Sequence, residues 1–447
     1  MTSSPAPAAS ADLDLPGSPR RWRQLALLSG LISMDNSEAG VVSTLFPAIR
    51  TALGLPLSAL GVLVAISKIV TMIFGPVWVL VAQRFGRKTV LVTTCGLWGL
   101  WSCAAGLSQN FTQLLVLYTI AAIGFAAGGP LINGLLADLF DDSHRGRAAG
   151  LLYGGAAVVG ALVAPALGQL SRLDDGWRYG FFAAGAVTVA AGLLVWRFFE
   201  DPHIGATDGP TVPQTTLGLS QARQLLAGRT LRLILVQRLF NTQLAFMSFG
   251  VVFLVGTRGF SNADAALIAP FSMLSYLLGT VLGGFLGDYV QRILPRTGRL
   301  ALWQSAVALW AAAAALGTQV PWSELWIYGA IFTVVGLTQG FVPGCNRPIL
   351  IAVTAPELRS AAFSLMLGAE SAGWAISTLI IGYLGDRIGL QATLLYVVVA
   401  VTFANAVFMS LLYRPYSRES EAVHRHSNEL ADVARTSQPR DAVTNEN

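Results

Sequence analysis

Twelve apolar stretches of about twenty residues constrain the fold of this chain more than any other feature of its sequence. A helix of that length can cross the hydrocarbon core of a bilayer. Charged residues make up only 12% of the chain, about half of the share that is usual in soluble proteins. We therefore predict an all-α membrane protein with twelve transmembrane helices. The predicted spans are 24–46, 57–82, 88–108, 112–137, 147–170, 178–199, 231–255, 263–287, 299–318, 322–350, 360–384 and 390–413.

Most of the 29 Lys and Arg residues lie in segments that share one side of the predicted membrane with the N-terminus. Cytoplasmic loops carry such an excess, so we predict a multi-pass cell-membrane protein with both termini in the cytoplasm. This distribution accounts for the net charge of +5 without a nucleic-acid partner. Cys95, Cys103 and Cys345 lie in apolar runs, and they are too few and too scattered for a disulfide framework or a metal site. No cofactor is predicted.

Two pairs of similar segments recur at the same spacing in the two halves of the chain. The segment that begins at Arg145 resembles the one that begins at Arg359, and the segment at Gly168 resembles the one at Gly382. A six-plus-six duplication with pseudo-two-fold symmetry explains the recurrence, and it places binding between the halves near the membrane midplane. The predicted organisation is a disordered tail at 1–19, a six-helix bundle at 20–199, a linker with a short interfacial helix at 200–230, a second bundle at 231–414 and a disordered tail at 415–447.

Asp35 and Glu38 interrupt the first apolar stretch. Being three residues apart, they share one face of a helix, and an acid at bilayer depth costs roughly 2.5 to 3.5 kcal/mol on insertion scales. We predict that at least one of them couples transport to protons, and that Asn36 between them binds substrate. The alternative is that the pair only contacts a neighbouring helix, or lies too near the outer surface to act in transport.

Polar residues also lie within the spans of the C-terminal half. Asn346 and Arg347 stand between two prolines, and irregular backbone at depth is tolerated where it lines a cavity. We predict that Arg347, with Asn346, holds a substrate carboxylate or phosphate by a two-pronged contact. Arg238 and Asn241, early in the seventh span, are predicted to bind substrate on the same grounds. For both arginines the alternative is a side chain that snorkels to the cytoplasmic face.

The loop after the second span resembles the signature loop of the major facilitator superfamily. It runs from Gly75 to Lys88, and its second copy runs from Gly284 to Asp288. The segments Asp138 to Arg145 and Gly176 to Tyr179 are also similar to that superfamily, and the likeness covers about residues 20–415. The residues that it implies in the gating loops are Gly75, Arg84, Gly86, Arg87, Lys88, Asp138, Arg145, Gly284, Asp288 and Arg359.

The first loop departs from the superfamily pattern at two positions. Gln83 stands where the family has an acid, and Val79 stands where it has a glycine. The charge lock that the loop supplies to the inward gate is therefore in doubt in the first half, whereas the second half keeps Asp288. Asp35 and the segment from Pro356 to Ser364 also resemble the spinster-type lipid transporters, although span four lacks their buried acid and arginine.

The resemblance implies that the second and eleventh spans face each other across the two halves. Lys68 and Glu370 lie near the middle of these spans. We predict that they form, or compete for, an ion pair that breaks during alternation, and that Glu370 is a third candidate for proton coupling. The alternative is that each residue is satisfied within its own half.

The sequence contains no catalytic motif, and it predicts a monomeric transporter that works by alternating access. The first hypothesis is a proton-coupled exporter of an amphipathic or hydrophobic compound, such as a drug-like molecule or a lysophospholipid, because the predicted lining is mostly apolar. The second is a proton symporter for a small organic anion, with Arg347 as its clamp. A passive lipid facilitator or a receptor that does not transport is the remaining alternative, and the paired acids weigh against passive movement.

Overall fold

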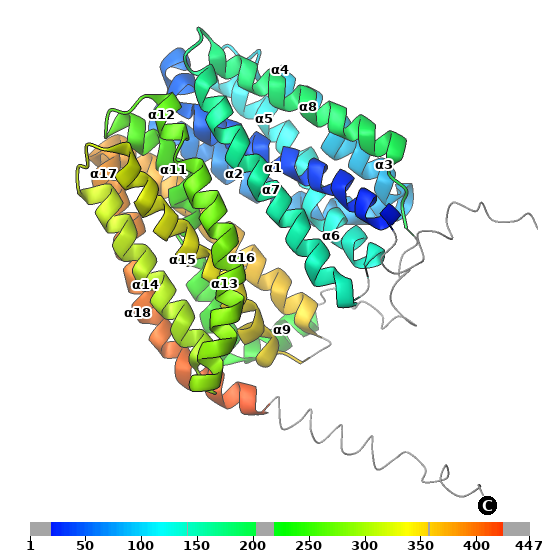
Figure 1. Cartoon of the computed structure of the whole chain (residues 1–447), viewed down its shortest axis with the longest axis vertical. Coiled ribbons are helices and arrows are strands. Elements are labelled where there is room, and N and C mark those ends of the chain that lie inside the picture. The colour runs from blue at the N-terminus through cyan, green and yellow to red at the C-terminus, as the bar shows by residue number, and fades with distance from the viewer. Residues whose placement is uncertain (1–18, 141, 203–218, 356–357, 423–447) are drawn as a thin grey trace, which may run out of the picture.

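The computed structural model describes residues 19–140, 142–202, 219–355 and 358–422. These residues form helices joined by short turns, and none of them is in a β-strand (Figure 1). The first two ranges contain α1 (Pro19–Leu53), α2 (Leu57–Phe85), α3 (Arg87–Val92), α4 (Gly99–Ala105), α5 (Phe111–Phe125), α6 (Gly128–Leu139), α7 (Asp142–Leu170) and α8 (Gly176–Phe198). The last two contain α9 (Leu219–Ala227), α10 (Arg229–Leu239), α11 (Gln243–Gly256), α12 (Asn262–Ala266), α13 (Ala269–Ile293), α14 (Gly298–Gln319), α15 (Leu325–Ala352), α16 (Arg359–Ile388), α17 (Leu390–Thr393) and α18 (Val401–Phe408).

Ten of the twelve predicted spans correspond to described helices that are long and apolar enough to cross a membrane. The two others are also helical. Span 24–46 lies in α1, of which Gly40–Leu53 is an apolar stretch among the described residues, and span 88–108 is divided by a π-helical turn at Thr93–Leu97. The count of twelve membrane crossings therefore stays a prediction. The last helical stretch runs on to Ala422, past the predicted start of the C-terminal tail.

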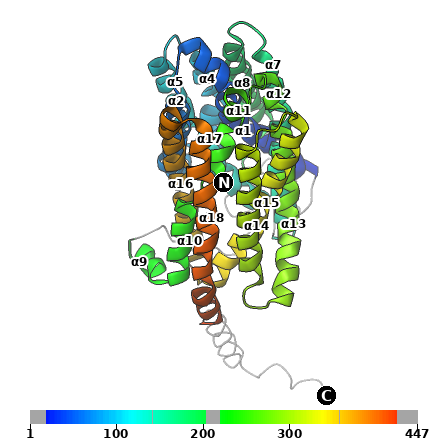
Figure 2. The same ribbon diagram turned by 90° about the vertical axis from the view of Figure 1, so that its left-hand side faces the viewer.

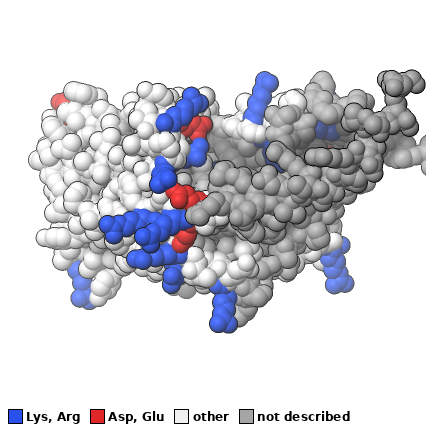
Figure 3. Space-filling view, turned by 90° about the horizontal axis from the view of Figure 1, so that it is seen from below, with Lys and Arg blue, Asp and Glu red and all other residues white. Residues whose placement is uncertain are grey.

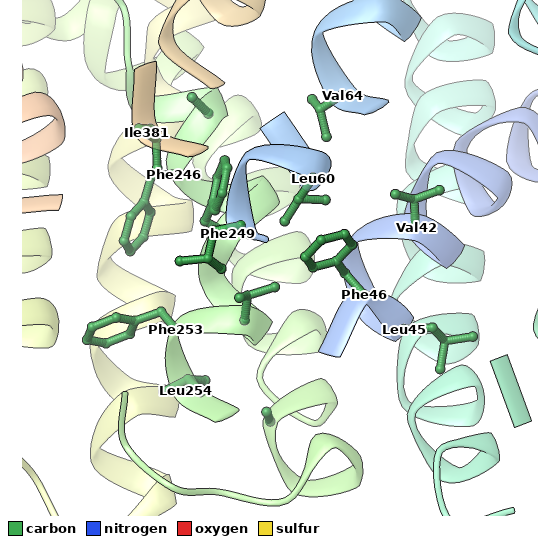
Figure 4. Close-up of a cluster of buried hydrophobic side chains, with 14 of the residues drawn as sticks. Val42, Leu45, Phe46, Leu60, Val64, Phe246, Phe249, Phe253, Leu254 and Ile381 are labelled. Atoms are coloured by element: carbon green, nitrogen blue, oxygen red, sulfur yellow. The ribbon is translucent and has the colours of Figure 1, made fainter. Parts of the chain in front are cut away.

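The buried apolar side chains form three clusters, and their membership shows where the two parts of the chain meet. One cluster draws only on residues between Leu25 and Phe199, and a second only on residues between Leu225 and Tyr416. The third combines both parts. In it, Val42, Phe46 and Leu60 of α1 and α2 lie beside Phe249 of α11 and Ile381 of α16 (Figure 4). The two parts thus share one cluster of buried apolar side chains, and they also meet where α7 lies against α13.

We call the two ends of the molecule the far end and the linker end. The far end holds the turn between α1 and α2 and the turn between α16 and α17, and it lies beside the shared core. The linker end holds Gly86, between α2 and α3, and the segment Phe199–Pro202. Helix α9, within the predicted linker, lies beside α10 at the linker end (Figure 2). Residues 203–218 of that linker lie outside the described residues.

Helices α13 and α15 approach each other closely along a row of glycines. A Cβ atom on Gly279 would lie 2.2 Å from the carbonyl oxygen of Leu337, and one on Gly340 would lie 2.3 Å from that of Tyr276. Small residues allow helix backbones to approach in this way within a membrane. This contact fixes the position of α15 against α13, and it therefore fixes Arg347 relative to Tyr276.

We expect Gly279→Ala to lower the thermal stability of the purified protein, because the added methyl group must push α13 away from α15. A methyl group in a tightly packed region costs about 1 to 3 kcal/mol. Gly284→Ala on the same helix is the matched control, since a Cβ atom there meets nothing within 4 Å. Thermal unfolding in detergent should show a clear loss for the first variant only. Equal melting temperatures for the two variants would contradict the prediction.

Candidate functional site

An ion pair joins the seventh and eleventh predicted spans inside the C-terminal half. The Nη2 atom of Arg238, on α10, lies 3.1 Å from Oε2 of Glu370, on α16. Only 5% of the Arg238 side chain and 19% of the Glu370 side chain are exposed. A buried guanidinium needs a partner of this kind, because an unpaired buried charge is strongly destabilising.

The end of α10 positions Arg238. The helix stops at Leu239, and α11 starts at Gln243, so the seventh span is interrupted just after the arginine. Asn405 donates to the backbone oxygens of Gln237 and Phe240, and it thereby satisfies carbonyl groups that the interruption frees.

A glycine lets α16 approach this interruption. A Cβ atom on Gly373 would lie 2.7 Å from the carbonyl oxygen of Arg238 and 2.5 Å from that of Leu239. Gly373 is three residues after Glu370, so both residues lie on the face of α16 that packs against α10. This close approach places the Glu370 carboxylate within reach of the arginine.

Arg347 lies close to this pair but has a different environment. Its side chain is exposed, and among the described residues no hydrogen-bond or ion-pair partner is found for it. Tyr276 of α13 is within electrostatic reach of Arg347, Arg238 and Glu370 together, so these four residues form one cluster. The neighbouring Asn346 is buried, and its Oδ1 atom has no hydrogen-bond partner within the described part of the chain. We call Arg238, Tyr276, Arg347 and Glu370 the arginine cluster.

Lys68 of α2 lies against the C-terminal half without contacting Glu370 as an ion pair. Its Nζ atom is 3.7 Å from the centre of the Trp374 ring, four residues along α16 from Glu370. The predicted contact between spans two and eleven is therefore present, but its chemistry differs from the predicted Lys68–Glu370 ion pair. Glu370 instead forms an ion pair with Arg238 of its own half, and the ammonium group of Lys68 makes a cation–π contact with Trp374.

The structure adds less to the other predicted substrate and proton residues. Asp35, Asn36 and Glu38 lie within the helical backbone of α1, but their side chains lie outside the described ones. Asn241 is buried beside the interruption of the seventh span, and the described residues provide no hydrogen-bond partner for its Oδ1 atom. Their predicted roles stay predictions.

The predicted gating residues gather at the linker end, where Figure 3 shows basic side chains with acidic ones between them. Arg87 contacts Asp138 and also reaches Oδ1 of Asp201 at 2.8 Å. On the other half, Arg299 lies 2.6 Å from Asp288. Among the residues that the structure describes, neither network contains an ion pair that joins the two halves.

The remaining predicted gating residues make local contacts. Lys88 and Arg145 donate to backbone oxygens of Phe199 and of Ala137 and Phe140, respectively. The other positions are as follows: Gly75 lies against α6, Arg84 over the ring of Phe85, Gly86 at a backbone φ of 87°, Gly284 beside open space and Arg359 at the start of α16.

One polar contact between the halves was not predicted from the sequence. Asp386, near the end of α16, accepts hydrogen bonds from the backbone nitrogens of Leu57 at 2.6 Å and Ser58 at 2.9 Å. These nitrogens are at the N-terminus of α2, where the preceding residue, Pro56, provides no side-chain cap. The signal in the sequence is a helix start without a capping residue, but nothing in the sequence indicates which distant acid supplies the cap.

Comparisons with known proteins show what the chain is similar to. A family model described as Major Facilitator Superfamily matches residues 26–347. The chain is 27% identical over 282 residues to a probable sulfoacetate transporter of Cupriavidus necator, covering 60% of this chain and 64% of that protein. The chain spans 44% and 60% of the lengths of two further relatives. It is 25% identical to a multidrug resistance protein of Proteus mirabilis, covering 80% of this chain and 87% of the relative.

A bacterial homologue of the human lysosomal transporter Spinster, solved in an inward-facing and unoccupied conformation, shares the fold. Its TM-score is 0.75 at 19% identity, with 92% of this chain and 98% of that chain covered.

Proposed function

The chain belongs to the major facilitator superfamily and is a multi-pass membrane transporter rather than an enzyme, and we propose that it carries small organic anions by proton-coupled alternating access. The observation that carries this proposal is the exposed Arg347, which has no ion-pair partner among the described residues and lies beside an arginine that is already neutralised. The cluster therefore holds one more positive than negative charge, and it has a guanidinium group free to bind a carboxylate through two parallel hydrogen bonds.

Supporting evidence comes from two relatives. The probable sulfoacetate transporter and a 3-(3-hydroxy-phenyl)propionate transporter of Escherichia coli are both named for organic anions, and they match 60% and 56% of this chain, respectively. An anion in the membrane interior needs cationic partners, because transfer of a charge out of water is costly without them. Arg347 supplies such a partner, and the buried Asn346 beside it offers an unpaired amide oxygen to a hydroxyl group of the substrate.

Proton coupling is assigned to the acids within the spans. Asp35, Glu38 and Glu370 are the candidates, because an acid at bilayer depth is costly and usually functional. In the proposed arrangement the linker end and both termini face the cytoplasm, and the protein lies in the cell membrane as a monomer of two six-helix bundles. The conformation described here opens between the bundles at the linker end, where a substrate that has been taken up would leave. The separate cores of the two parts support access from that end.

A second candidate function is export of an amphipathic drug-like compound or a lysolipid. The similarity to the multidrug resistance protein covers more of the chain than the similarity to the sulfoacetate transporter does, and this favours it. It accounts less well for an exposed arginine beside a buried ion pair. A hydrophobic or cationic cargo gains nothing from a free guanidinium group.

The test is uptake into proteoliposomes, with and without an imposed pH gradient. The panel contains short organic anions, a cationic drug and a lysophospholipid. We expect saturable uptake of organic anions that is accelerated when the outside is acidic, and we expect Asp35→Asn or Glu38→Gln to remove the acceleration while leaving exchange intact. Movement of the drug or the lipid alone would favour the second candidate. Flux that is indifferent to the gradient would exclude proton coupling.

A further inference from the structure

We infer that Glu370 is a specificity-determining residue, which sets the charge of the preferred substrate by occupying one of the two arginines of the arginine cluster. This inference rests on the proposed function, because it names the class of organic anion. Glu370 acts as a carboxylate supplied by the protein itself, and it leaves one guanidinium group for a carboxylate supplied by the substrate. The preferred cargo is therefore a monoanion.

The geometry distinguishes the two arginines. Arg238 is buried and holds the Glu370 carboxylate at 3.1 Å, whereas Arg347 is exposed and has no partner among the described residues. Nonetheless the two arginines share a neighbour, since both act on Tyr276 together with Glu370. A substrate that binds Arg347 through one carboxylate and extends past Tyr276 therefore meets a second guanidinium group, which is already paired.

A dianion meets an obstacle that a monoanion does not. Its second carboxylate can reach Arg238 only by displacing Glu370, which would leave the glutamate without its partner. If Glu370 stays in place, the second carboxylate faces a like charge at short range in a medium that screens it poorly. Both outcomes are unfavourable, and both depend on the charge of Glu370 rather than on its size.

Lys68 is a further cation beside α16, and its ammonium group lies on the ring of Trp374, one turn from Glu370. The wild type and every variant of the Arg238–Glu370 pair keep this lysine. Such variants therefore differ from one another only at that pair.

The test is equilibrium binding of two probes that differ by one carboxylate, benzoate and isophthalate, to the purified full-length protein near neutral pH. Four proteins form a charge series. Glu370→Gln adds one positive charge relative to the wild type, Arg238→Gln removes one, and the double variant Arg238→Gln/Glu370→Gln restores the wild-type charge while removing both members of the pair. Binding is measured directly, so a defect in proton coupling does not obscure the result.

We expect the preference for isophthalate over benzoate to rise by about tenfold or more in Glu370→Gln, because a nearby like charge is removed. It should fall in Arg238→Gln and return to the wild-type ratio in the double variant. If Glu370→Gln does not fold with an unpaired arginine, the order of the other three proteins still decides the matter. A ratio that does not change across the series would overturn the inference while leaving the proposed function intact. A wild-type protein that binds no organic anion would overturn both.

Discussion

Substitution of Arg347 by Gln is expected to raise the KM for organic-anion uptake by about ten- to a hundredfold. A hydrogen bond to a charged group contributes about 1.5 to 3 kcal/mol, and the proposed clamp loses its charge and its fork geometry together. The side chain is exposed and has no ion-pair partner among the described residues, so its removal leaves none of their carboxylates unpaired. The variant should therefore fold normally, and initial uptake rates over a range of concentrations should show the change.

Two further variants separate a clamp from a simple surface charge. Arg347→Lys keeps the positive charge but cannot form two parallel hydrogen bonds, so we expect a KM between those of the wild type and the Gln variant. Arg292→Gln removes an exposed arginine near the linker end of α13, outside the arginine cluster, and should leave KM unchanged. A snorkelling arginine would give a different pattern, in which Arg347→Gln alters stability or yield while the KM stays at the wild-type value.

Much of the fold could be predicted from hydropathy, because the length of an apolar stretch is a local property of the sequence. All twelve predicted spans fall on helices. The interruptions within the spans were harder to predict, since they depend on partners from other helices. The seventh span is interrupted at Phe240–Thr242, where the side-chain amide of Asn405 donates hydrogen bonds to the carbonyl groups that the interruption frees. The third span contains a π-helical turn at Thr93–Leu97 that the sequence did not predict.

The candidate site shows the same limit at the level of pairs. The sequence identified Arg238, Lys68, Glu370 and Arg347 as unusual, because charges within spans are rare whatever their partners. It did not identify which of them pair with each other. Glu370 pairs with Arg238 because Gly373 allows α16 to lie against the end of α10. This approach depends on how two helices pack, so it cannot be read from either sequence segment alone. Tyr276 and Trp374 were missed, since aromatic residues are common in spans and carry no distinguishing signal.

Substitution of Asp386 by Ala is expected to shift the protein away from the conformation in which its far ends are joined. Asp386 belongs to α16, and it caps the N-terminus of α2 through the backbone nitrogens of Leu57 and Ser58. Loss of a helix N-cap costs about 0.5 to 2 kcal/mol. Here the cap comes from the other half, so the cost falls only on the conformation that brings the far ends together. The population ratio should change about two- to thirtyfold, in line with that free energy.

The measurement is the distance distribution between two spin labels at the far end, one on each half, in a background without the three native cysteines. The wild type should populate mainly the short distance, and Asp386→Ala should gain a longer one. Asp264→Ala is the matched control. Asp264 also lies at the far end and bonds to Ser261 at a helix start, but both residues belong to one half. Helix α12 packs against α7 of the other half, but the lost hydrogen bond lies within one half, so the distance distribution should change less than in Asp386→Ala.

The linker end explains why this contact should have a large effect. There, Arg87 and Arg299 bind acids of their own halves, and Gln83 replaces the acid that related transporters use to lock that end. Nothing among the described linker-end residues offsets the far-end cap, so removal of the cap changes the balance directly. A pulsed electron-spin measurement in which Asp386→Ala and Asp264→Ala both match the wild type would contradict this account. The apolar core around Phe46, Phe249 and Ile381 would then be sufficient to hold the far ends together.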